Sequence, residues 1–323
     1  MKEESISFGS GLQGIYIRAG GSSVNAEPSP VFVLINAGFL HSIGPNRLYT
    51  DLCRRLAVYG FDSLRFDLPG IGNSLEADSA YTNSVAEGVA RQESSSEVVT
   101  KSINEALSIL SEESPARKFV LCGLCSGADD ALEFARHDDR VAGIVAIDSA
   151  GFRTPGFYLY HFLQHYPRRL LSLSKWQAAL RAVLDRSADK KIADSDPIAN
   201  ANDGYRKISE AREFRDRLTD IISRNSGNGG QADENGKCEM LFVYTGGVAH
   251  YYNHEEQFNS MIKDIEVGEQ LRVNYYPDSD HLLLVSAHRE ALIKDTINWA
   301  CSNLLSCDPG NSSDTRESSR NVA

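Results

Sequence analysis

The segment 121–130, LCGLCSGADD, contains two cysteines and two glycines at spacings that several kinds of chemistry use. Cys122 and Cys125 form a CxxC pair, which is typical of a redox dithiol or of half a zinc site. Gly123 and Gly127 lie two residues on either side of Cys125, a spacing typical of a sharp turn that presents a nucleophile. The third alternative is a turn whose small residues only pack.

The two cysteines have different surroundings. Cys122 falls within RKFVLCG, an apolar run that predicts a buried strand, whereas Cys125 directly precedes a helix-forming segment that begins at Ser126. A redox pair has both thiols at the start of a helix, and the sequence has no second CxxC pair to complete a zinc site. We therefore predict that Cys122 packs in the core and that Cys125 is a nucleophile at a strand-to-helix turn. The competing interpretation of Cys125 is a small apolar residue in a turn.

A nucleophilic thiol needs a base, and His281 has the setting of one. It follows the strand-like segment QLRVNYYP in the sequence DSDH and precedes a helix. Of the eight histidines, only His281 has this position. The order along the chain, with the nucleophile first and the histidine last, is that of one common arrangement of catalytic triads.

The third member of a triad is a carboxylate that orients the imidazole. The strand CEMLFVYTGG is followed by no acidic residue as far as Asn253, whereas the preceding strand, RVAGIVAID, ends at Asp148. We therefore assign the acid to Asp148. Asp278 and Asp280 are fallbacks, but they lie too near His281 in the sequence for a favourable hydrogen bond to its ring.

An oxyanion at the attacked carbonyl needs two backbone N–H donors. The N–H of Ser126 follows the nucleophile and lies at a helix N-terminus, whose partial positive charge also favours a thiolate. The second donor is expected from the loop after PVFVLINAGF, so Phe39 and Leu40 are the candidates.

These side chains need a scaffold that places the ends of several strands together. Apolar strand-like runs alternate with helix-like segments along the chain, which predicts a mostly parallel, doubly wound α/β sheet. We assign residues 1–150 and 238–305 to this core. Residues 151–237 contain amphipathic patterns and are predicted to form a helical cap inserted after the strand that ends at Asp148. Residues 306–323 are predicted to be a flexible tail from their composition.

The predicted cap and one loop offer candidate substrate-binding side chains. Tyr158, Phe162 and Trp176 are aromatic residues that can line a substrate tunnel, although packing is the commoner role for such residues. Arg47 can hold a substrate carboxylate or phosphate, with a surface ion pair as the alternative. His254, near His250 and two glutamates, is expected in a solvated loop, and we predict no metal site and no cofactor.

Bulk composition excludes some partners. The formal net charge of −11 disfavours nucleic acid, whose binding proteins need a basic surface. No apolar run reaches the length of about 18 residues that a membrane span needs, so we predict no membrane span. The polar start of the chain and six irregularly spaced cysteines indicate a cytoplasmic protein with reduced thiols.

The chain resembles the α/β-hydrolase superfamily over about residues 10–305. Four stretches are also similar to the exosortase A system-associated hydrolase 1 group, which is associated with exopolysaccharide loci: GPNRLYTDLCRRLAVYGFDSLRFDLPGIGNS, GLCSGADDA, FRT and LQHYPRRLLSLSKW. Asp148-Ser149 departs from the Asn-Pro pair expected in that group. An acid at Asp148 is also similar to the arrangement in thioesterase domains of polyketide and peptide synthases.

Together these features predict an acyl-transfer enzyme that uses a Cys125-His281-Asp148 triad on an ester or thioester, as a thioesterase, acyltransferase or cyclase does. An acyl carrier protein or a coenzyme A thioester is a candidate donor. One alternative is a carboxylesterase or a lactone hydrolase similar to dienelactone hydrolase. The other is a binding protein that keeps the fold without catalysis.

Overall fold

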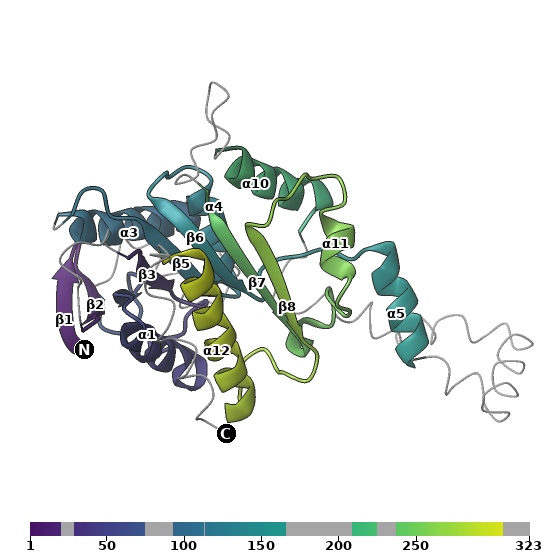
Figure 1. Cartoon of the computed structure of the whole chain (residues 1–323), viewed down its shortest axis with the longest axis horizontal. Helices are drawn as coiled ribbons and strands as arrows, with labels where there is room; N and C mark the ends of the chain where they lie inside the picture. Colours follow the sequence, from purple (N-terminus) through teal and green to yellow (C-terminus); the bar gives the residue numbers. More distant parts are fainter. Residues whose placement is uncertain (21–28, 75–92, 113, 166–208, 225–236, 306–323) are drawn as a thin grey trace, which may run out of the picture.

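The structure is a computed structural model that describes residues 1–20, 29–74, 93–112, 114–165, 209–224 and 237–305. An eight-stranded sheet with the order β1-β2-β4-β3-β5-β6-β7-β8 runs through the molecule (Figure 1). The strands are β1 (Lys2–Phe8), β2 (Leu12–Arg18), β3 (Val31–Ile35), β4 (Ser63–Asp67), β5 (Phe119–Leu124), β6 (Val141–Ile147), β7 (Glu239–Thr245) and β8 (Leu271–Tyr276).

The sheet is mostly parallel, as the alternating sequence pattern predicts. β2 pairs antiparallel with both β1 and β4, and every other neighbouring pair is parallel. The carboxyl ends of β3, β5, β6, β7 and β8 therefore meet at one edge, which is where open α/β sheets carry their reacting groups.

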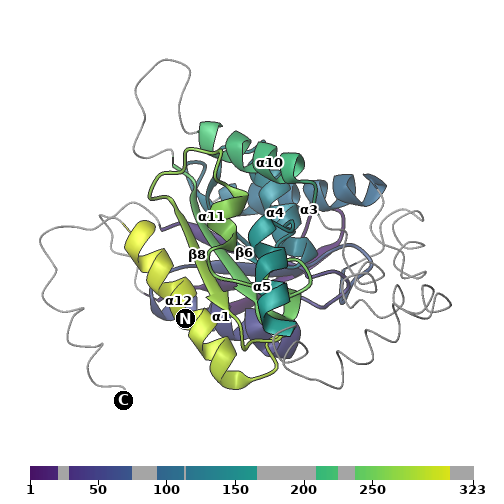
Figure 2. The ribbon, with the colours of Figure 1, turned by 90° about the vertical axis from the view of Figure 1, so that its right-hand side faces the viewer.

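Helices cover both faces of the sheet. They are α1 (Leu48–Val58), α3 (Glu93–Ser111), α4 (Ser126–Ala135), α5 (Pro155–His165), α10 (Ala211–Ser223), α11 (Gln257–Met261) and α12 (Ser286–Asn303), with short 3-10 turns η1 (Pro45–Arg47) and η6 (Gly246–Val248). Figure 2 shows α1 and α12 on one side of the sheet and α3, α4 and α10 on the other. Strands β3 and β5 are buried along their whole length because both of their faces are covered.

Two helices lie in the described parts of the segment predicted as a cap. α5 leaves the sheet after β6, whereas α10 packs on α4. Phe214 of α10 also meets Phe152 of the loop after β6, with their ring centroids 5.8 Å apart. α10 thus shares the main apolar core of the sheet and packs on one of its covering helices, which differs from the separate cap that the sequence predicts. Residues 166–208 and the predicted tail, 306–323, lie outside the described residues.

The described residues include five of the six cysteines and all of the helices named above. Cys53, Cys122, Cys125, Cys238 and Cys301 are all free thiols there. Within the same residues, no helix combines the length and the apolar character needed to cross a bilayer.

Candidate active site

Cys125 lies in the sharp turn between β5 and α4. Its backbone has φ 57° and ψ −122°, a conformation that is unfavourable for a residue with a side chain and is held only by its surroundings. Its N–H donates to the Ile147 carbonyl at 2.9 Å, and its own carbonyl accepts the N–H of Ala128 at 3.0 Å. The turn is therefore fixed to the end of β6 on one side and to the first turn of α4 on the other.

The two glycines around Cys125 allow a close backbone approach. A Cβ atom on Gly123 would lie 2.2 Å from the carbonyl carbon of Gly127, and one on Gly127 would lie 2.6 Å from the Asn36 carbonyl oxygen. No side chain fits at either position. The Gly-x-Cys-x-Gly spacing thus closes the turn on itself and seats it against the end of β3.

Cys122 lies on β5 and is completely buried. Burial raises the pKa of this thiol well above its usual range, so it stays protonated. The first thiol of the CxxC motif is therefore a packing residue, as predicted.

Asp148 lies directly after β6, and its carboxylate is in contact with the imidazole of His281. Oδ2 of Asp148 is 2.7 Å from Nδ1 of His281. The carboxylate also accepts the Thr245 N–H on Oδ1 at 2.7 Å and the Thr245 hydroxyl on Oδ2 at 2.8 Å. Asp148 is fully buried, so these donors replace the water that a carboxylate would otherwise bind.

Thr245 is a site residue that the sequence analysis missed. It ends β7, the strand after which no acidic residue was found, and its N–H and hydroxyl hold the acid that the neighbouring strand supplies. A hydroxyl residue before two glycines at a strand end was the available signal, but a threonine in that place has many other roles.

The loop that carries His281 is held by its neighbours. A Cβ atom on Gly247 would lie 2.2 Å from the backbone nitrogen of His281, so only glycine fits beneath this loop. The carboxylate of Asp280 accepts the N–H groups of Leu282 and Leu284, each at 2.9 Å. Asp280 therefore shapes the turn after His281, and the fallback assignment of Asp278 or Asp280 as the acid is not needed.

The imidazole of His281 is hydrogen-bonded to Cys125 as well as to Asp148. Because Nδ1 faces the carboxylate, Nε2 is the nitrogen left for the sulfur. Burial of the ring lowers the pKa of His281, but the hydrogen bonds and charges of Asp148 and Cys125 outweigh it and raise the pKa to about 9. The imidazole of His281 is therefore protonated at neutral pH.

The two candidate loop donors for an oxyanion differ in what they already bind. The Leu40 N–H donates to the Ala37 carbonyl at 3.0 Å, so it is occupied in a turn. No described residue accepts the Phe39 N–H. Phe39 is therefore the better candidate to act with Ser126, whose N–H opens α4.

Hydrogen bonds join this loop to the nucleophile turn and to β4. The Gly38 N–H donates to the Ser126 hydroxyl at 2.8 Å. The buried carboxylate of Asp67 accepts the Ser42 N–H at 2.7 Å and lies 3.2 Å from Nε2 of His41. The loop after β3 is thus fixed at both of its ends.

The residues proposed to bind substrate have different environments. Arg47 is largely exposed and lies 3.9 Å from the carboxylate of Asp51, so it is engaged in a surface ion pair. Tyr158 and Phe162 are exposed on α5. Trp176 lies outside the described residues.

The prediction of a solvated loop is wrong for His254. This residue is buried, its ring stacks on Tyr160 with a centroid distance of 4.2 Å, and Nδ1 lies 2.9 Å from Oδ1 of Asn253. Burial lowers the pKa of His254, so it is neutral at pH 7. Its role is to join α5 to the loop after β7, a contact that no local sequence pattern reveals. No cluster of three potential metal ligands occurs among the residues the structure covers.

Exposed apolar side chains occur on three segments of the described chain. They belong to the loop after β3, to the loop that follows His281 and to α5, and the two loops are joined by a hydrogen bond from the Asn46 side chain to the Leu282 carbonyl at 2.9 Å. The residues are Phe39, Leu40, Ile43, Leu282, Leu284, Val285, Tyr158, Leu159, Tyr160, Phe162 and Leu163.

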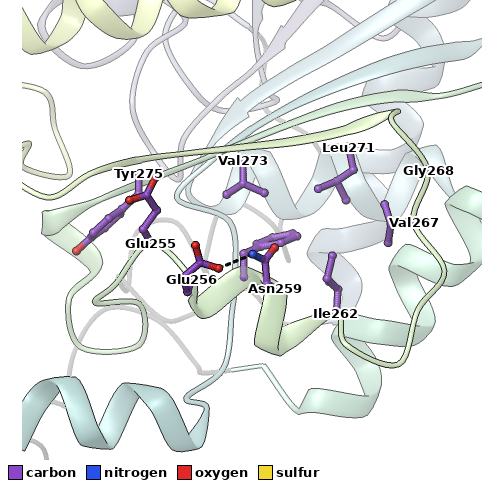
Figure 3. Close-up of a pocket in the computed structure, with 10 residues that line it drawn as sticks. Glu255, Glu256, Asn259, Ile262, Val267, Gly268, Leu271, Val273 and Tyr275 are labelled. Atoms are coloured by element: carbon purple, nitrogen blue, oxygen red, sulfur yellow. Dashed lines mark hydrogen bonds between the residues drawn. The ribbon is translucent and has the colours of Figure 1, made fainter.

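Two surface hollows lie apart from the triad. One, of about 370 Å³, is bounded by α11 and β8, with Leu271 and Val273 on one side and Glu256, bonded to Asn259, on the other (Figure 3). The second, of about 390 Å³, is lined by Tyr160, His254 and neighbouring residues. Neither contains Cys125, His281 or Asp148, so neither is the proposed reaction site.

No family model and no curated protein matches this chain. Among solved structures it is similar to the alpha/beta hydrolase GrgF from Penicillium sp. sh18, with a TM-score of 0.51 and 14% identity over 94% of this chain and 98% of that one. An esterase from Pyrococcus furiosus gives a TM-score of 0.51 and 12% identity over 94% and 91% of the two chains. The acylaminoacyl peptidase of Pyrococcus horikoshii gives a TM-score of 0.51 and 14% identity over 94% of this chain and 42% of that one.

These likenesses, together with the eight-stranded sheet, show that the chain has the α/β-hydrolase fold. The similarity to the exosortase-associated group is carried by sequence motifs alone.

Proposed function

We propose that the protein is an acyl-transfer enzyme in which Cys125, His281 and Asp148 form a catalytic triad. The observation that carries this proposal is the continuous hydrogen-bonded contact from the thiol through the imidazole to the buried carboxylate. The three residues come from the ends of three different strands. A packing cysteine needs neither a strained turn nor an imidazole at its sulfur.

In the first half of the reaction, the Cys125 thiolate attacks the carbonyl carbon of an ester or thioester. The N–H groups of Ser126 and Phe39 donate hydrogen bonds to the oxyanion that forms. The imidazolium of His281 then gives its proton to the leaving alcohol or thiol as the bond from the carbonyl carbon breaks. The products are an acyl-cysteine and a neutral imidazole.

In the second half, His281 takes a proton from water, an alcohol or an amine as that group attacks the acyl-cysteine. The tetrahedral intermediate collapses and expels the thiolate, which restores the ion pair with the imidazolium. Asp148 holds the Nδ1–H tautomer throughout, so that Nε2 faces the reacting atoms.

The sulfur nucleophile favours transfer over simple hydrolysis. An acyl-cysteine keeps the activation of a thioester, so its attack by an alcohol or amine remains favourable, whereas an acyl-serine ester has lost that activation. A carboxylesterase or a lactone hydrolase would use the same triad with water as the acceptor. The acceptor therefore distinguishes these alternatives.

Exposed apolar side chains on the loops after β3 and after His281 support a substrate with an apolar acyl group. The exposed Phe39 carries a proposed oxyanion donor, and the exposed Leu282 directly follows His281, so both lie next to a reacting group. A thioester of coenzyme A or of an acyl carrier protein fits this proposal as the donor, in a cytoplasmic setting. The helical cap predicted over residues 151–237 also stays a proposal, apart from α10, which packs on α4.

Labelling of Cys125 tests whether the site is catalytic. Iodoacetamide should alkylate one thiol rapidly at neutral pH, and the reaction should be lost in Cys125→Ala and slowed in His281→Ala. Cys301→Ala is the matched control, because Cys301 is the other half-exposed thiol among the described residues and its removal should leave the fast reaction intact. Absence of fast labelling from about pH 6 to 9 would instead favour a binding protein without catalysis.

The choice between transfer and hydrolysis needs the trapped intermediate. Incubation with a panel of acyl thioesters, followed by intact-protein mass measurement, should reveal an acyl adduct that is absent in Cys125→Ala. Cys125→Ser should hydrolyse the same donor faster and lose transfer to an added amine or alcohol. If the parent enzyme hydrolyses the donor as fast as Cys125→Ser and transfers nothing, the transferase assignment is wrong and the esterase alternative holds.

A further inference from the structure

Tyr49 is a fully buried tyrosine whose hydroxyl joins the two strands that lead into the proposed reaction site. It lies in the first turn of α1. Its hydroxyl donates to the Ile35 carbonyl at 3.0 Å and accepts the Leu124 N–H at 2.8 Å. Both backbone groups are thereby satisfied by one side chain from a helix.

These two partners are the last residues of their strands. β3 ends at Ile35 and β5 ends at Leu124, and the register of the two strands pairs Ile35 with Gly123. Leu124 is thus one residue beyond the last direct pair. The hydroxyl of Tyr49 occupies the point where the strands separate, with the Phe39 loop beginning on one side and Cys125 on the other.

The ring of Tyr49 has little freedom to move. A Cβ atom on Gly44, which has φ +74°, would lie 2.8 Å from Cγ of Tyr49, so the Gly44 backbone packs directly on the ring. The Tyr49 N–H also donates to the Ile43 carbonyl at 3.1 Å. Burial raises the pKa of Tyr49 well above its ordinary value, so the hydroxyl stays protonated and can donate and accept at once.

We propose that Tyr49 is a positioning residue that sets the separation of the two oxyanion donors, the N–H groups of Phe39 and Ser126. Phe39 follows β3 by four residues and Ser126 follows β5 by two, so a change in the strand separation at the Tyr49 hydroxyl is passed to both donors. Tyr49 itself touches no substrate. This inference rests on the acyl-transfer function proposed above.

The test compares two reactions of the same thiol. Turnover of 4-nitrophenyl butyrate passes through an oxyanion, whereas alkylation by iodoacetamide displaces iodide at a saturated carbon and needs only the thiolate. Tyr49→Phe should lower kcat about tenfold or more with little change in KM, because a small misplacement of catalytic groups is costly. Its alkylation rate and the pH dependence of that rate should match those of the parent.

Tyr252→Phe is the matched control. Tyr252 is also fully buried, and its hydroxyl donates to the Glu255 carbonyl, away from the nucleophile turn. It should retain the parent kcat. If Tyr49→Phe does not fold, 4-fluorophenylalanine at position 49 fills the volume of the hydroxyl without an O–H donor, and the same loss of kcat is expected.

The outcomes separate the two proposals. An active parent with unchanged kcat in Tyr49→Phe, or with kcat and alkylation lowered together, overturns the positioning role and leaves the triad intact. A parent that is alkylated but never forms an acyl adduct or turns over any ester or thioester overturns the acyl-transfer function, and the role of Tyr49 falls with it.

Discussion

Nδ1 of His281 lies 2.7 Å from Oδ2 of Asp148, although 133 residues separate them in the chain. The carboxylate is completely buried, whereas the imidazole side chain is 32% exposed. The charge of Asp148 is therefore held away from water while the opposite edge of the ring reaches the sulfur of Cys125. This arrangement makes the carboxylate an orienting group and leaves proton transfer to the imidazole.

Asp148→Asn should lower kcat by at least about 10²-fold while the fold is retained. The asparagine side chain has only one acceptor oxygen, whereas the Thr245 N–H, the Thr245 hydroxyl and the His281 ring all donate to the carboxylate. The NH₂ group must therefore face one of these donors, which disfavours the Nδ1–H tautomer of His281. Initial rates with 4-nitrophenyl butyrate measure the loss. NMR titration of His281 should show its pKa moving down from about 9, because the largest contribution that raises it is gone.

Asp278→Asn is the control for that substitution. Asp278 is exposed and lies three residues before His281, so it tests the alternative acid without disturbing the buried network. It should retain nearly the parent rate. A large loss in Asp278→Asn with none in Asp148→Asn would reverse the assignment of the acid.

The raised pKa of His281 predicts a pH-dependent contribution to stability. The folded protein binds this proton more tightly than the unfolded chain, whose imidazole has the ordinary pKa of 6.5. The contribution is therefore fully present below about pH 6.5 and is lost as the pH rises through about 9. Urea denaturation of the parent and of His281→Gln should give free energies of unfolding whose difference favours the parent most in acid and shrinks toward about pH 10. A difference that grows with pH contradicts the ion pair.

The sequence alone predicted the parts of the site that depend on local order. Glycines at fixed spacing predicted the turn at Cys125, and apolar runs predicted the strand ends that carry Asp148 and His281. Because no acidic residue follows the β7 segment, the sequence assigned the triad carboxylate to Asp148 at the end of β6. Each of these inferences needed only residues near one another in the chain and the rule that parallel strands end at one edge.

The contacts that fix those residues depend on tertiary structure. Thr245 and Tyr49 contribute hydrogen bonds from other elements, and His254 is buried because α5 covers it. α10 packs on α4 although its amphipathic pattern fits a cap equally well, because such a pattern shows that one face is buried and does not show against what. Pairings of this kind have no local signal.

Gly123→Ala should destabilise the protein far more than Gly38→Ala. The added Cβ atom at Gly123 would meet backbone at 2.2 Å, which no rotamer can relieve, so we expect a loss of about 3 kcal/mol or more. Gly38 has no atom within 4 Å of the same added atom and only its φ of +56° opposes a side chain, which costs about 1 kcal/mol. Urea denaturation measures both, and equal losses would show that the nucleophile turn opens more easily than its packing indicates.

Ser126→Ala tests whether the oxyanion loop is held by the nucleophile turn. The Ser126 hydroxyl is the acceptor for the Gly38 N–H at 2.8 Å, and Gly38 directly precedes the proposed donor Phe39. Without that acceptor the loop loses its direct tie to α4, so kcat should fall about tenfold while alkylation of Cys125 by iodoacetamide is unchanged. Ser102→Ala removes a more deeply buried hydroxyl that bonds the Val98 carbonyl within α3, so it should cost at least as much stability and leave kcat alone. A fall in kcat confined to Ser126→Ala would therefore be due to the changed position of the oxyanion loop. An equal fall in kcat in both variants would instead indicate a general loosening of the fold.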